Sequence, residues 1–364
     1  MRLRHLHLPS IHPHYVPYSL ASRVQEHLRR QHLDFKDGSS TTTTLKPPPP
    51  TLLSFTPAPI YTLGRRQTTP LSAPETARLT APLSIPSPKL GGQGGEDADA
   101  DADAVVSLRP QIHHAPRGGL TTYHGPGQIV LWPVLDLHPP DHHYRHLSVK
   151  CYARLLETTT INTLASLFAI AAQTTEDPGV WVCRRRRRHS SSSSSSFREE
   201  GEEEGEGGEM AKIAALGVHL RRHVTALGTA VNVAMPGPEV LDEGWNPWAR
   251  IVACGLAGRG VTSVVGELGG ISSEVLDGML LKQTQTQTLG PTVGSSNSSR
   301  ERAVAGAWGE ELARGLGLAG GLVETVDGEE VVRLMEGLAL LPGENGEEEE
   351  RVYVERIREA VCRR

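Results

Sequence analysis

Apolar residues in the N-terminal part of the chain follow first an alternating and then a helical spacing. Residues 6–11 predict a short strand, and the four-residue spacing of leucine and valine over residues 18–33 predicts a helix. Residues 52–63 are β-like, but their prolines indicate an edge or a bend of a sheet. A weaker apolar run over residues 104–108 predicts a further strand.

The strongest strand signals lie in the middle of the chain. The nearly continuous apolar run Ile-Val-Leu-Trp-Pro-Val-Leu at residues 129–135 predicts a buried strand. Residues 180–183 and 212–218 predict the two strands of a hairpin, and residues 224–233 predict another strand. Gly228 within it indicates a bulge or a close approach of another backbone.

Helical spacing of apolar residues dominates the remaining periodic segments. It extends over residues 146–172, 302–316, 331–341 and 352–361. Strands and helices are therefore mixed along the chain without regular βαβ alternation. This pattern predicts the α/β class, with a mixed sheet and flanking helices.

Five segments contain too few apolar residues to build a core, because they consist mainly of Ser, Thr, Pro, Gly, Asp-Ala, Arg or Glu runs. They cover about residues 38–50, 88–104, 184–209, 284–300 and 343–350. We expect them to be disordered insertions, the third of them forming the tip of the predicted hairpin. The remaining roughly 230 residues suit one domain, so we interpret residues 1–364 as a single interrupted domain.

Charge and cysteine usage exclude several classes of protein. The net charge of −5 argues against a general nucleic-acid binder. The positive charge of the arginine run at residues 184–188 is largely cancelled by the glutamates that follow it. Cys151, Cys183, Cys254 and Cys362 are widely spaced, which disfavours a zinc site or a disulfide framework and indicates a reducing compartment. No run of 18 apolar residues exists, so we expect no membrane span.

The N-terminus is rich in arginine and poor in acids. Arg2 and Arg4 precede the predicted first strand, and Arg23 lies within the predicted first helix. No acidic residue occurs before Glu26. Such a start is compatible with import into an organelle. Because the same residues belong to predicted elements of the domain, a separate cleavable peptide is not expected.

A glycine-rich stretch precedes the buried strand and reads Arg-Gly-Gly-Leu-Thr-Thr-Tyr-His-Gly-Pro-Gly-Gln over residues 117–128. Glycine allows a ligand to lie against the main chain, and the side chains between the glycines can form hydrogen bonds with a polar substrate. A polar loop that leads into a buried strand is typical of a binding site. The alternative interpretation is an ordinary glycine turn before a core strand.

Four motifs together resemble a known family. They are the stretch at residues 117–128, Asp-Pro-Gly-Val-Trp at 177–181, Lys-Ile-Ala-Ala-Leu-Gly at 212–217 and Cys-Gly-Leu-Ala-Gly at 254–258. Their order and spacing resemble the lipoyl(octanoyl) transferases, and the insertions resemble a fungal, mitochondrial-type member. The resemblance implies a fold similar to the catalytic domain of biotin and lipoate protein ligases.

The resemblance also implies a reaction and its partners. The family moves an octanoyl group from octanoyl-acyl carrier protein, through a cysteine thioester, to a lysine of a lipoyl domain. The acceptors are the lipoyl domains of 2-oxoacid dehydrogenase E2 subunits and the glycine cleavage H protein. The implied location is the mitochondrial matrix, and the reaction needs no cofactor.

The same resemblance assigns the site residues. Cys254 corresponds to the nucleophile, and Lys212 corresponds to the lysine that tunes it. The expected substrate-binding residues are Arg117, Gly118, Gly119, Leu120, Thr121, Thr122, Tyr123, His124, Ala215, Leu216, Gly217, Gly228, Thr229 and Ala230.

Elementary chemistry explains why a cysteine beside a lysine suits acyl transfer. An ammonium at ~4 Å contributes about 4 kcal/mol at an effective dielectric constant of about 20, so Lys212 is expected to lower the pKa of the Cys254 thiol. Cys151 and Cys183 lie on apolar-periodic segments and are expected to be buried structural thiols instead. Backbone amides of Gly118, Gly119 and Gly255 are candidate oxyanion donors, while the expected walls of an apolar slot for the octanoyl tail are Leu216 and Leu227.

Some assignments and two alternative functions stay open. Arg117 either meets an anionic group or braces the loop, and His124 is expected to position the thioester or the amine. The first alternative function is an ATP-dependent lipoate–protein ligase of the same fold, which needs no acyl-enzyme. The second is a non-catalytic interaction protein that uses the charged insertions on this scaffold.

Overall fold

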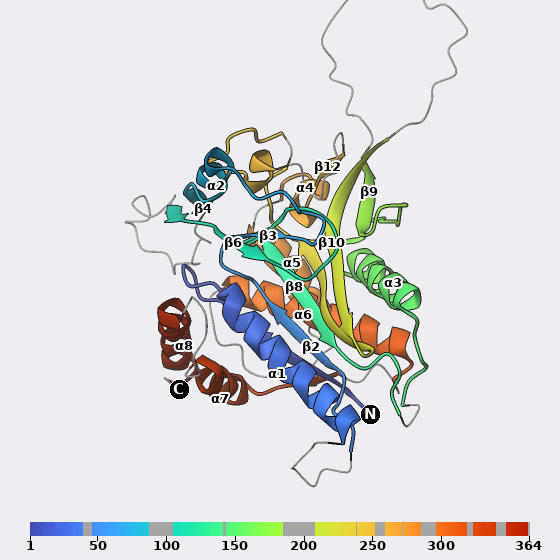
Figure 1. Cartoon of the computed structure of the whole chain (residues 1–364). Helices are drawn as coiled ribbons and strands as arrows, with labels where there is room; N and C mark the ends of the chain where they lie inside the picture. The colour runs from blue at the N-terminus through green and yellow to red at the C-terminus, as the bar shows by residue number, and fades with distance from the viewer. Residues whose placement is uncertain are drawn as a thin grey trace, which may run out of the picture.

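The computed structural model describes residues 1–38, 46–86, 105–140, 143–184, 208–237, 239–251, 259–271, 273–284, 296–318, 323–339 and 347–362. A central mixed sheet runs through this part of the chain, in the strand order β12-β10-β11-β8-β2-β1-β13, with β9 paired to β10 (Figure 1). Its strands are β1 (Leu3–Leu8), β2 (Thr51–Phe55), β8 (Gln128–Val134), β9 (Val180–Arg184), β10 (Glu209–Arg221), β11 (Val224–Asn232), β12 (Gly260–Val261) and β13 (Val323–Thr325). Three pairs are parallel (β1 with β2, β1 with β13 and β10 with β12), and the other pairs are antiparallel. The predicted α/β class with a mixed sheet and flanking helices is confirmed.

Helices cover both faces of this sheet. On one face α1 (Tyr18–Asp37), α7 (Gly328–Ala339) and α8 (Glu347–Cys362) share a buried apolar cluster with Val130 and Trp132 of β8. On the other face α3 (Val149–Phe168), α5 (Ser273–Thr284) and α6 (Ser296–Leu316) share a second cluster with Ile129 and Leu131. Because alternate residues of β8 face two apolar layers, the strand is buried at every position and reads as one continuous apolar run.

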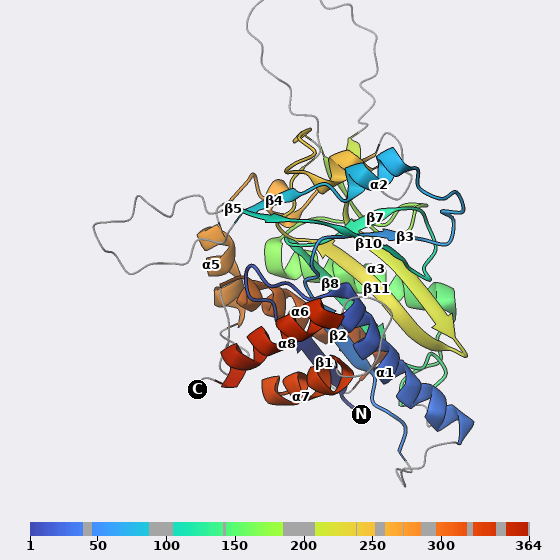
Figure 2. The ribbon, with the colours of Figure 1, turned by 60° about the vertical axis from the view of Figure 1, so that its left-hand side comes forward.

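A smaller layer lies above one end of the central sheet (Figure 2). It contains the three-stranded sheet β6-β3-β7, made of β3 (Ile60–Leu63), β6 (Gln111–His114) and β7 (Thr122–His124), and the pair β4 (Leu83–Pro86) and β5 (Val105–Leu108). The helix α2 (Ala73–Leu79) and the 3-10 turn η1 (Pro247–Arg250) complete it, whereas Val264 of α4 (Val264–Glu267) belongs to the apolar core beneath the central sheet. Tyr61, Tyr123 and Trp248 form the centre of its small apolar core.

Most of the predicted elements agree with the structure, and the hairpin of β9 and β10 is confirmed by the pairing of Arg184 with Glu209. Of the edge or bend that the prolines of residues 52–63 indicated, the structure has the bend, which separates β2 from β3, and both strands are central in their sheets. Gly228 is a point of close approach, since a Cβ there would collide with the carbonyl oxygen of Leu131.

Two of the predicted insertions are partly ordered, which corrects their assignment. Helix α6 begins at Ser296, inside the segment 284–300, and α8 begins at Glu347, inside the segment 343–350. Glu350 is 1% exposed and pairs with Arg23 at 2.7 Å, so part of the glutamate run docks onto α1. Residues 185–207 lie outside the described part of the chain.

Further differences concern short elements and thiols. The sequence pattern did not predict α2, β4, β6, α5 or β13, and residues 122–124, expected to be part of a loop, form the strand β7. Cys151 and Cys183 are exposed, not buried as expected. Within the described ranges, no helix combines the length and the apolar character needed to cross a membrane.

Candidate active site

Lys212 lies on the half of β10 that β11 does not cover. At this point β10 is flanked by β9 on one side and β12 on the other, and Lys212 is paired with Trp181 and with Val261. The register with β9 shifts between Lys212 and Ala214, a bulge of the kind that re-aims side chains next to active sites. The side chain is buried, with the residue only 7% exposed, which is rare for a lysine.

The Asp-Pro-Gly turn before β9 encloses the Lys212 side chain. The ammonium donates a hydrogen bond to the carbonyl oxygen of Pro178 at 3.1 Å and lies 4.6 Å from the centre of the Trp181 ring. Gly179 has a φ of +125°, and a Cβ there would lie 2.7 Å from the carbonyl oxygen of Ala214 and 3.3 Å from Cε of Lys212. Only glycine fits this turn without strain, which gives the second motif a local structural reason.

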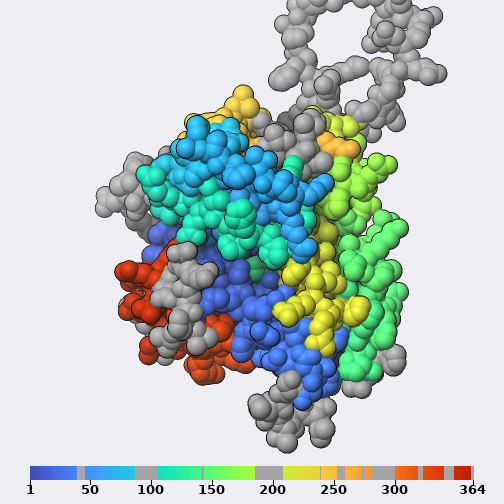
Figure 3. Space-filling model, viewed as in Figure 1, coloured from blue at the N-terminus to red at the C-terminus, as the bar shows by residue number. Residues whose placement is uncertain are grey.

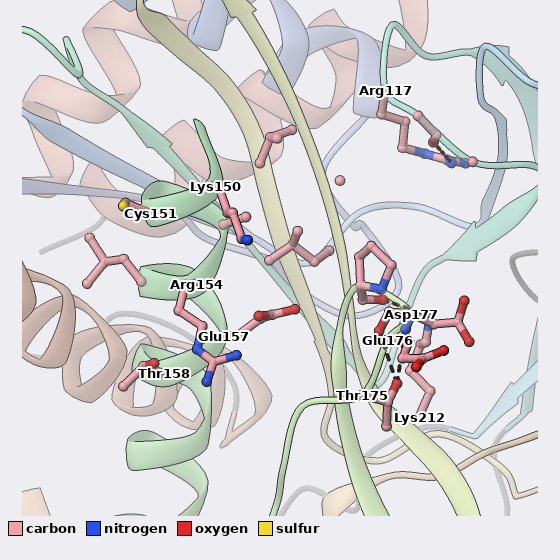
Figure 4. A pocket seen from close by; sticks show the side chains of 18 of the residues that line it. Arg117, Lys150, Cys151, Arg154, Glu157, Thr158, Thr175, Glu176, Asp177 and Lys212 are labelled. Carbon is pink, nitrogen blue, oxygen red and sulfur yellow. Dashed lines mark hydrogen bonds between the residues drawn. The ribbon is translucent and has the colours of Figure 1, made fainter. Parts of the chain in front are cut away.

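A cleft of about 1100 Å³ opens beside Lys212. Six of the expected site residues line it, and they are Arg117, Gly118, Gly119, Lys212, Leu216 and Gly217. Figure 4 shows side chains of α3 on one side of the cleft, Glu176, Asp177 and Lys212 grouped on another, and Arg117 at a further corner. The glycine-rich loop and the strand with the lysine therefore share one cavity.

Arg117 braces the loop to which it belongs. Its guanidinium donates to the carbonyl and hydroxyl oxygens of Thr62, at 2.6 and 2.7 Å, and to the carbonyl oxygens of Gly118 and Leu120, both at 2.9 Å. The residue is 8% exposed. Of the two roles that the sequence left open, the observed contacts are those of a brace.

A smaller pocket, of about 40 Å³, lies on the other side of Arg117, Leu216 and Gly217 and brings together most of the remaining expected residues. Those residues are Thr122, His124, Ala215, Gly228, Thr229 and Ala230, together with Leu227. Gly217 and Gly228 are direct partners in the ladder between β10 and β11. The two glycines let other groups approach the strands closely, since a Cβ would lie 2.9 Å from Cδ of Arg117 at Gly217 and 2.3 Å from the carbonyl oxygen of Leu131 at Gly228. Figure 3 shows the yellow hairpin of β10 and β11 between the blue α1 and the green α3.

Buried hydrogen bonds connect His124 in this pocket with the segment that follows β12. Nδ1 of His124 lies 2.7 Å from Oε1 of Gln128, Nε2 of Gln128 donates to Oδ1 of Asn232 at 2.7 Å, and Nδ2 of Asn232 donates to the carbonyl oxygen of Thr262 at 2.9 Å. The backbone N–H of Thr262 in turn donates to the carbonyl oxygen of Lys212 at 3.0 Å. We call His124, Gln128, Asn232 and Thr262 the amide relay.

Burial sets the protonation state of His124, and the relay sets its tautomer. Burial lowers the pKa of the imidazole to about 4, so the ring is neutral near pH 7. Because Oε1 of Gln128 accepts, the proton of the neutral ring sits on Nδ1 and Nε2 is an acceptor. His124 can therefore accept a hydrogen bond from a group in the pocket without carrying charge.

Several expected site residues lie elsewhere. Tyr123 is 1% exposed and packs between Tyr61 and Trp248, so its side chain belongs to the core of the small layer. Leu120 and Thr121 line neither cavity. The segment 252–258, and with it Cys254 and Gly255, lies outside the described residues.

Other residues of the two cavities had no sequence signal of their own. Tyr18 and Trp132 close the smaller pocket, with their rings 5.3 Å apart, although one begins α1 and the other lies in β8. Pro178 and Trp181 were visible as a motif but not as the contacts of Lys212. Among the described residues, no group of three or more His, Cys, Asp or Glu side chains is arranged to hold a metal ion.

The chain is similar to proteins of one family. Residues 86–284, more than half of the chain, match the family described as the lipoyl protein ligase A/B catalytic domain. The mitochondrial octanoyl-[acyl-carrier-protein]:protein N-octanoyltransferase LIPT2 of Danio rerio is 31% identical over 259 residues, which cover 71% of this chain and 82% of that protein. An octanoyltransferase of Paracoccus denitrificans is 32% identical over 195 residues, 54% of this chain and 75% of that protein.

Two further comparisons concern a fungal relative and a solved structure. The probable octanoyltransferase of Schizosaccharomyces pombe is 28% identical over 248 residues, 68% of this chain and 80% of that protein. A crystal structure of lipoate-protein ligase A bound with ATP covers 84% of this chain and 94% of its own, with a TM-score of 0.38 and 12% identity.

Proposed function

The chain belongs to the lipoyl protein ligase A/B catalytic domain family, and on that premise we propose that it transfers an octanoyl group from acyl carrier protein, through a thioester on Cys254, to a lysine of a lipoyl domain. The relatives are named octanoyltransferases, so the enzyme class is acyltransferase. The proposed acceptors are lipoyl domains of 2-oxoacid dehydrogenase E2 subunits and the glycine cleavage H protein. Two relatives are named mitochondrial, which supports a mitochondrial location, and we infer the matrix.

The observation that carries this proposal is a buried ammonium at the wall of a large cleft. Lys212 is held by Pro178 and Trp181 and faces the same cavity as Gly118 and Gly119. An ammonium kept out of water stabilises a nearby anion more strongly than an exposed one does. Such a group is suited to hold a thiol as a thiolate, the nucleophilic form of cysteine.

The position of Arg259 supports Cys254 as that thiol. Arg259 pairs with Asp177 at 2.6 Å, and its guanidinium carbon lies 5.2 Å from the centre of the Trp181 ring that Lys212 also contacts. Cys254 precedes Arg259 by five residues, a stretch of chain that spans at most about 18 Å. A Cys254 thiol within reach of Lys212 is therefore compatible with the position of Arg259.

The proposed reaction has two steps. In the first, the Cys254 sulfur attacks the thioester carbonyl carbon, a new C–S bond forms, and the carrier's thiol leaves with the proton that the cysteine gave up. In the second, the neutral amine of the acceptor lysine attacks the same carbon, the C–N bond forms, and the cysteine sulfur leaves. Lys212 relays the proton in both steps, and backbone N–H groups of the glycine-rich loop stabilise the oxyanion.

The decisive experiment is mass spectrometry of the full chain after incubation with octanoyl-acyl carrier protein, without ATP. We expect an octanoyl adduct on Cys254 that disappears when a lipoyl domain is added and is absent from Cys254→Ser. Cys151→Ser and Cys183→Ser are matched controls, because both thiols are exposed and should leave the adduct unchanged. An adduct on Cys151 or Cys183 instead would reject the proposed nucleophile.

The same incubation separates the alternatives. Transfer that depends on ATP and proceeds without an enzyme adduct would identify a lipoate–protein ligase. No transfer under either condition, with partner binding retained and dependent on residues 184–209, would favour the non-catalytic interaction protein.

A further inference from the structure

Four exposed cations surround the mouth of the large cleft. They are Arg66 after β3, Arg145 before α3, and Lys150 and Arg154 on α3 itself, and we call them the basic rim. Within the described part of the chain, none of the four forms an ion pair with a carboxylate. The one side-chain partner seen for Arg154 is the neutral hydroxyl of Thr174, at 3.4 Å.

The inner charges of the cleft are already engaged. Lys212 and Arg117 are buried, and both donate to backbone carbonyl groups. Glu157 accepts a hydrogen bond from the N–H of Gly179 at 3.2 Å, and Asp177 pairs with Arg259. On the described surface the charge that faces an arriving molecule is therefore mainly that of the basic rim, opposed by the exposed carboxylate of Glu176.

The two rim residues of α3 have a spacing suited to neighbouring anions. Lys150 and Arg154 are four residues apart, so they lie on one helix face about 6 Å apart along the axis. Figure 4 shows both on the side of the cleft that faces Lys212 and Asp177. An anionic group held by this pair would sit at the entrance, with the cleft leading from it towards the ammonium.

We propose that the basic rim is the docking surface for the acyl donor, binding the acidic face of the carrier protein and the phosphate of its phosphopantetheine arm. This inference rests on the proposed function. The donor brings its thioester on an arm that carries an anion, whereas the acceptor brings a lysine, which is itself a cation before it loses a proton. Charge complementarity at this entrance thus favours the anionic arm of the donor over the ammonium of the acceptor lysine.

The test compares two octanoyl donors, octanoyl-acyl carrier protein and the small molecule octanoyl-pantetheine. Lys150→Glu/Arg154→Glu is expected to raise the KM for octanoyl-acyl carrier protein roughly tenfold or more, because two attractive contacts become repulsive. The kcat/KM for octanoyl-pantetheine, which has neither phosphate nor protein, should stay within about twofold. Added NaCl should raise the KM of the wild type for the protein donor and have a smaller effect on the variant.

Lys46→Glu/Arg351→Glu is the matched control, because it makes the same change of charge at two exposed positions away from the cleft. Its kinetic constants should equal those of the wild type. An unchanged KM in the rim variant, or an equal loss with both donors, would overturn the inference. So would a rise confined to the KM for the lipoyl domain, which would make the rim an acceptor surface.

Different outcomes reject the octanoyltransferase function and the docking role of the basic rim. If the wild type transfers the octanoyl group from neither donor, the proposed function is rejected, and the inference about the rim with it. If the wild type is active with both donors and the rim variant is indistinguishable from it, only the docking surface is rejected.

Discussion

Lys212 lies in an environment that is unusual for its residue type. Lysines are rarely buried, yet this one is 7% exposed and contacts a carbonyl group and an indole ring. Both contacts come from one turn and strand, residues 177–184, so the ammonium is held in place by local chain geometry. A charge fixed in this way costs little reorganisation when a negative charge forms beside it.

Replacement of Lys212 by methionine should therefore remove the charge and keep the packing. We expect Lys212→Met to slow formation of the octanoyl adduct by roughly 100-fold or more, with an unchanged circular dichroism spectrum. The measurement is the time course of adduct formation by mass spectrometry. Lys46→Met serves as the control, and adduct formation at the wild-type rate would exclude Lys212 from the mechanism.

Gly179 is the residue that allows the turn to close over Lys212. Gly179→Ala should destabilise the fold by about 1–3 kcal/mol, because the alanine would adopt positive φ and its Cβ would press on the backbone at Ala214. Unfolding in urea measures the change. Gly269→Ala is the control, since Gly269 has a φ of +80° and nothing within 4 Å of an added Cβ. Equal losses in the two variants would show that only the φ angle matters.

The sequence predicted these residues to different degrees. Lys212, Arg117 and His124 were predicted because they belong to short motifs that together resemble a family. Their contacts were not predicted, since Lys212 meets Pro178 and Arg117 meets Thr62 only in the folded chain. Tyr18 and Trp132 could not be found, since they meet in the smaller pocket only after α1 packs on β8. A motif records local geometry, whereas a pocket is assembled from distant segments.

At the scale of elements, the amide relay joins β7, β8, β11 and the end of β12. Each member of the relay lies on a different element, and the last one is bonded to the backbone of Lys212 on β10. The orientation of His124 in the smaller pocket is therefore coupled to the position of the strand that carries the lysine. Buried amide groups with complete hydrogen bonding fix such an arrangement, because a broken bond leaves a polar group without a partner.

Asn232 is the central residue of the amide relay, and its replacement should disturb its hydrogen bonds to both Gln128 and Thr262. Asn232→Leu would leave Nε2 of Gln128 and the carbonyl oxygen of Thr262 unsatisfied, at about 1–3 kcal/mol for each group. We expect a lower free energy of unfolding in urea and slower octanoyl transfer. The exposed Asn162→Leu is the control and should stay within about 0.5 kcal/mol of the wild type. An equally small change at Asn232 would contradict a structural role of the relay.

Strands and helices were predicted well where one period extends over many residues. β8 and α1 are examples, since burial on two faces gives an apolar run and burial on one face gives a four-residue spacing. α2 has only seven residues and one buried side chain, so it has no stripe to detect. Its capping box, in which Ser72 and Glu75 bond each other's backbone N–H groups, was the available signal.

At the scale of the whole molecule, titratable groups are distributed through the interior rather than gathered at the site. Burial lowers the pKa of His5, His32 and His124 to about 4. Burial also raises the pKa of Glu301 to about 7. His5 shares its hydrogen bond to Ser54 with His7 on the same strand, far from the cleft in sequence and in the fold.

These groups predict an acid-labile protein. Each of the three histidines has a folded pKa below its unfolded value of 6.5, so its contribution to stability is complete above pH 6.5 and is lost as the pH falls towards 4. Each adds a slope of up to about 1.4 kcal/mol per pH unit. Glu301 acts in the opposite direction, since its stabilising effect is present below 4.5 and is lost as the pH rises through 7.

The histidines outnumber the glutamate, so stability should fall steeply from pH 6.5 to pH 5 and change little between pH 6.5 and 8.0, where the effects of the histidines and of Glu301 largely cancel. The measurement is the urea midpoint at pH 5.0, 6.5 and 8.0. In Glu301→Gln the midpoint should rise more between pH 6.5 and 8.0 than it does in the wild type, while the acid side stays steep. A midpoint at pH 5.0 equal to that at pH 6.5 would contradict the assignment of neutral buried histidines.

The ladder between β9 and β10 has a consequence for the spacing of two side chains at the site. Arg184 is paired with Glu209, so the two strand ends that border residues 185–207 in the sequence lie next to each other in the sheet. Trp181 and Lys212 are paired in the same ladder. The register of the two strands, and not the number of residues between them, therefore sets the spacing of the indole ring and the ammonium.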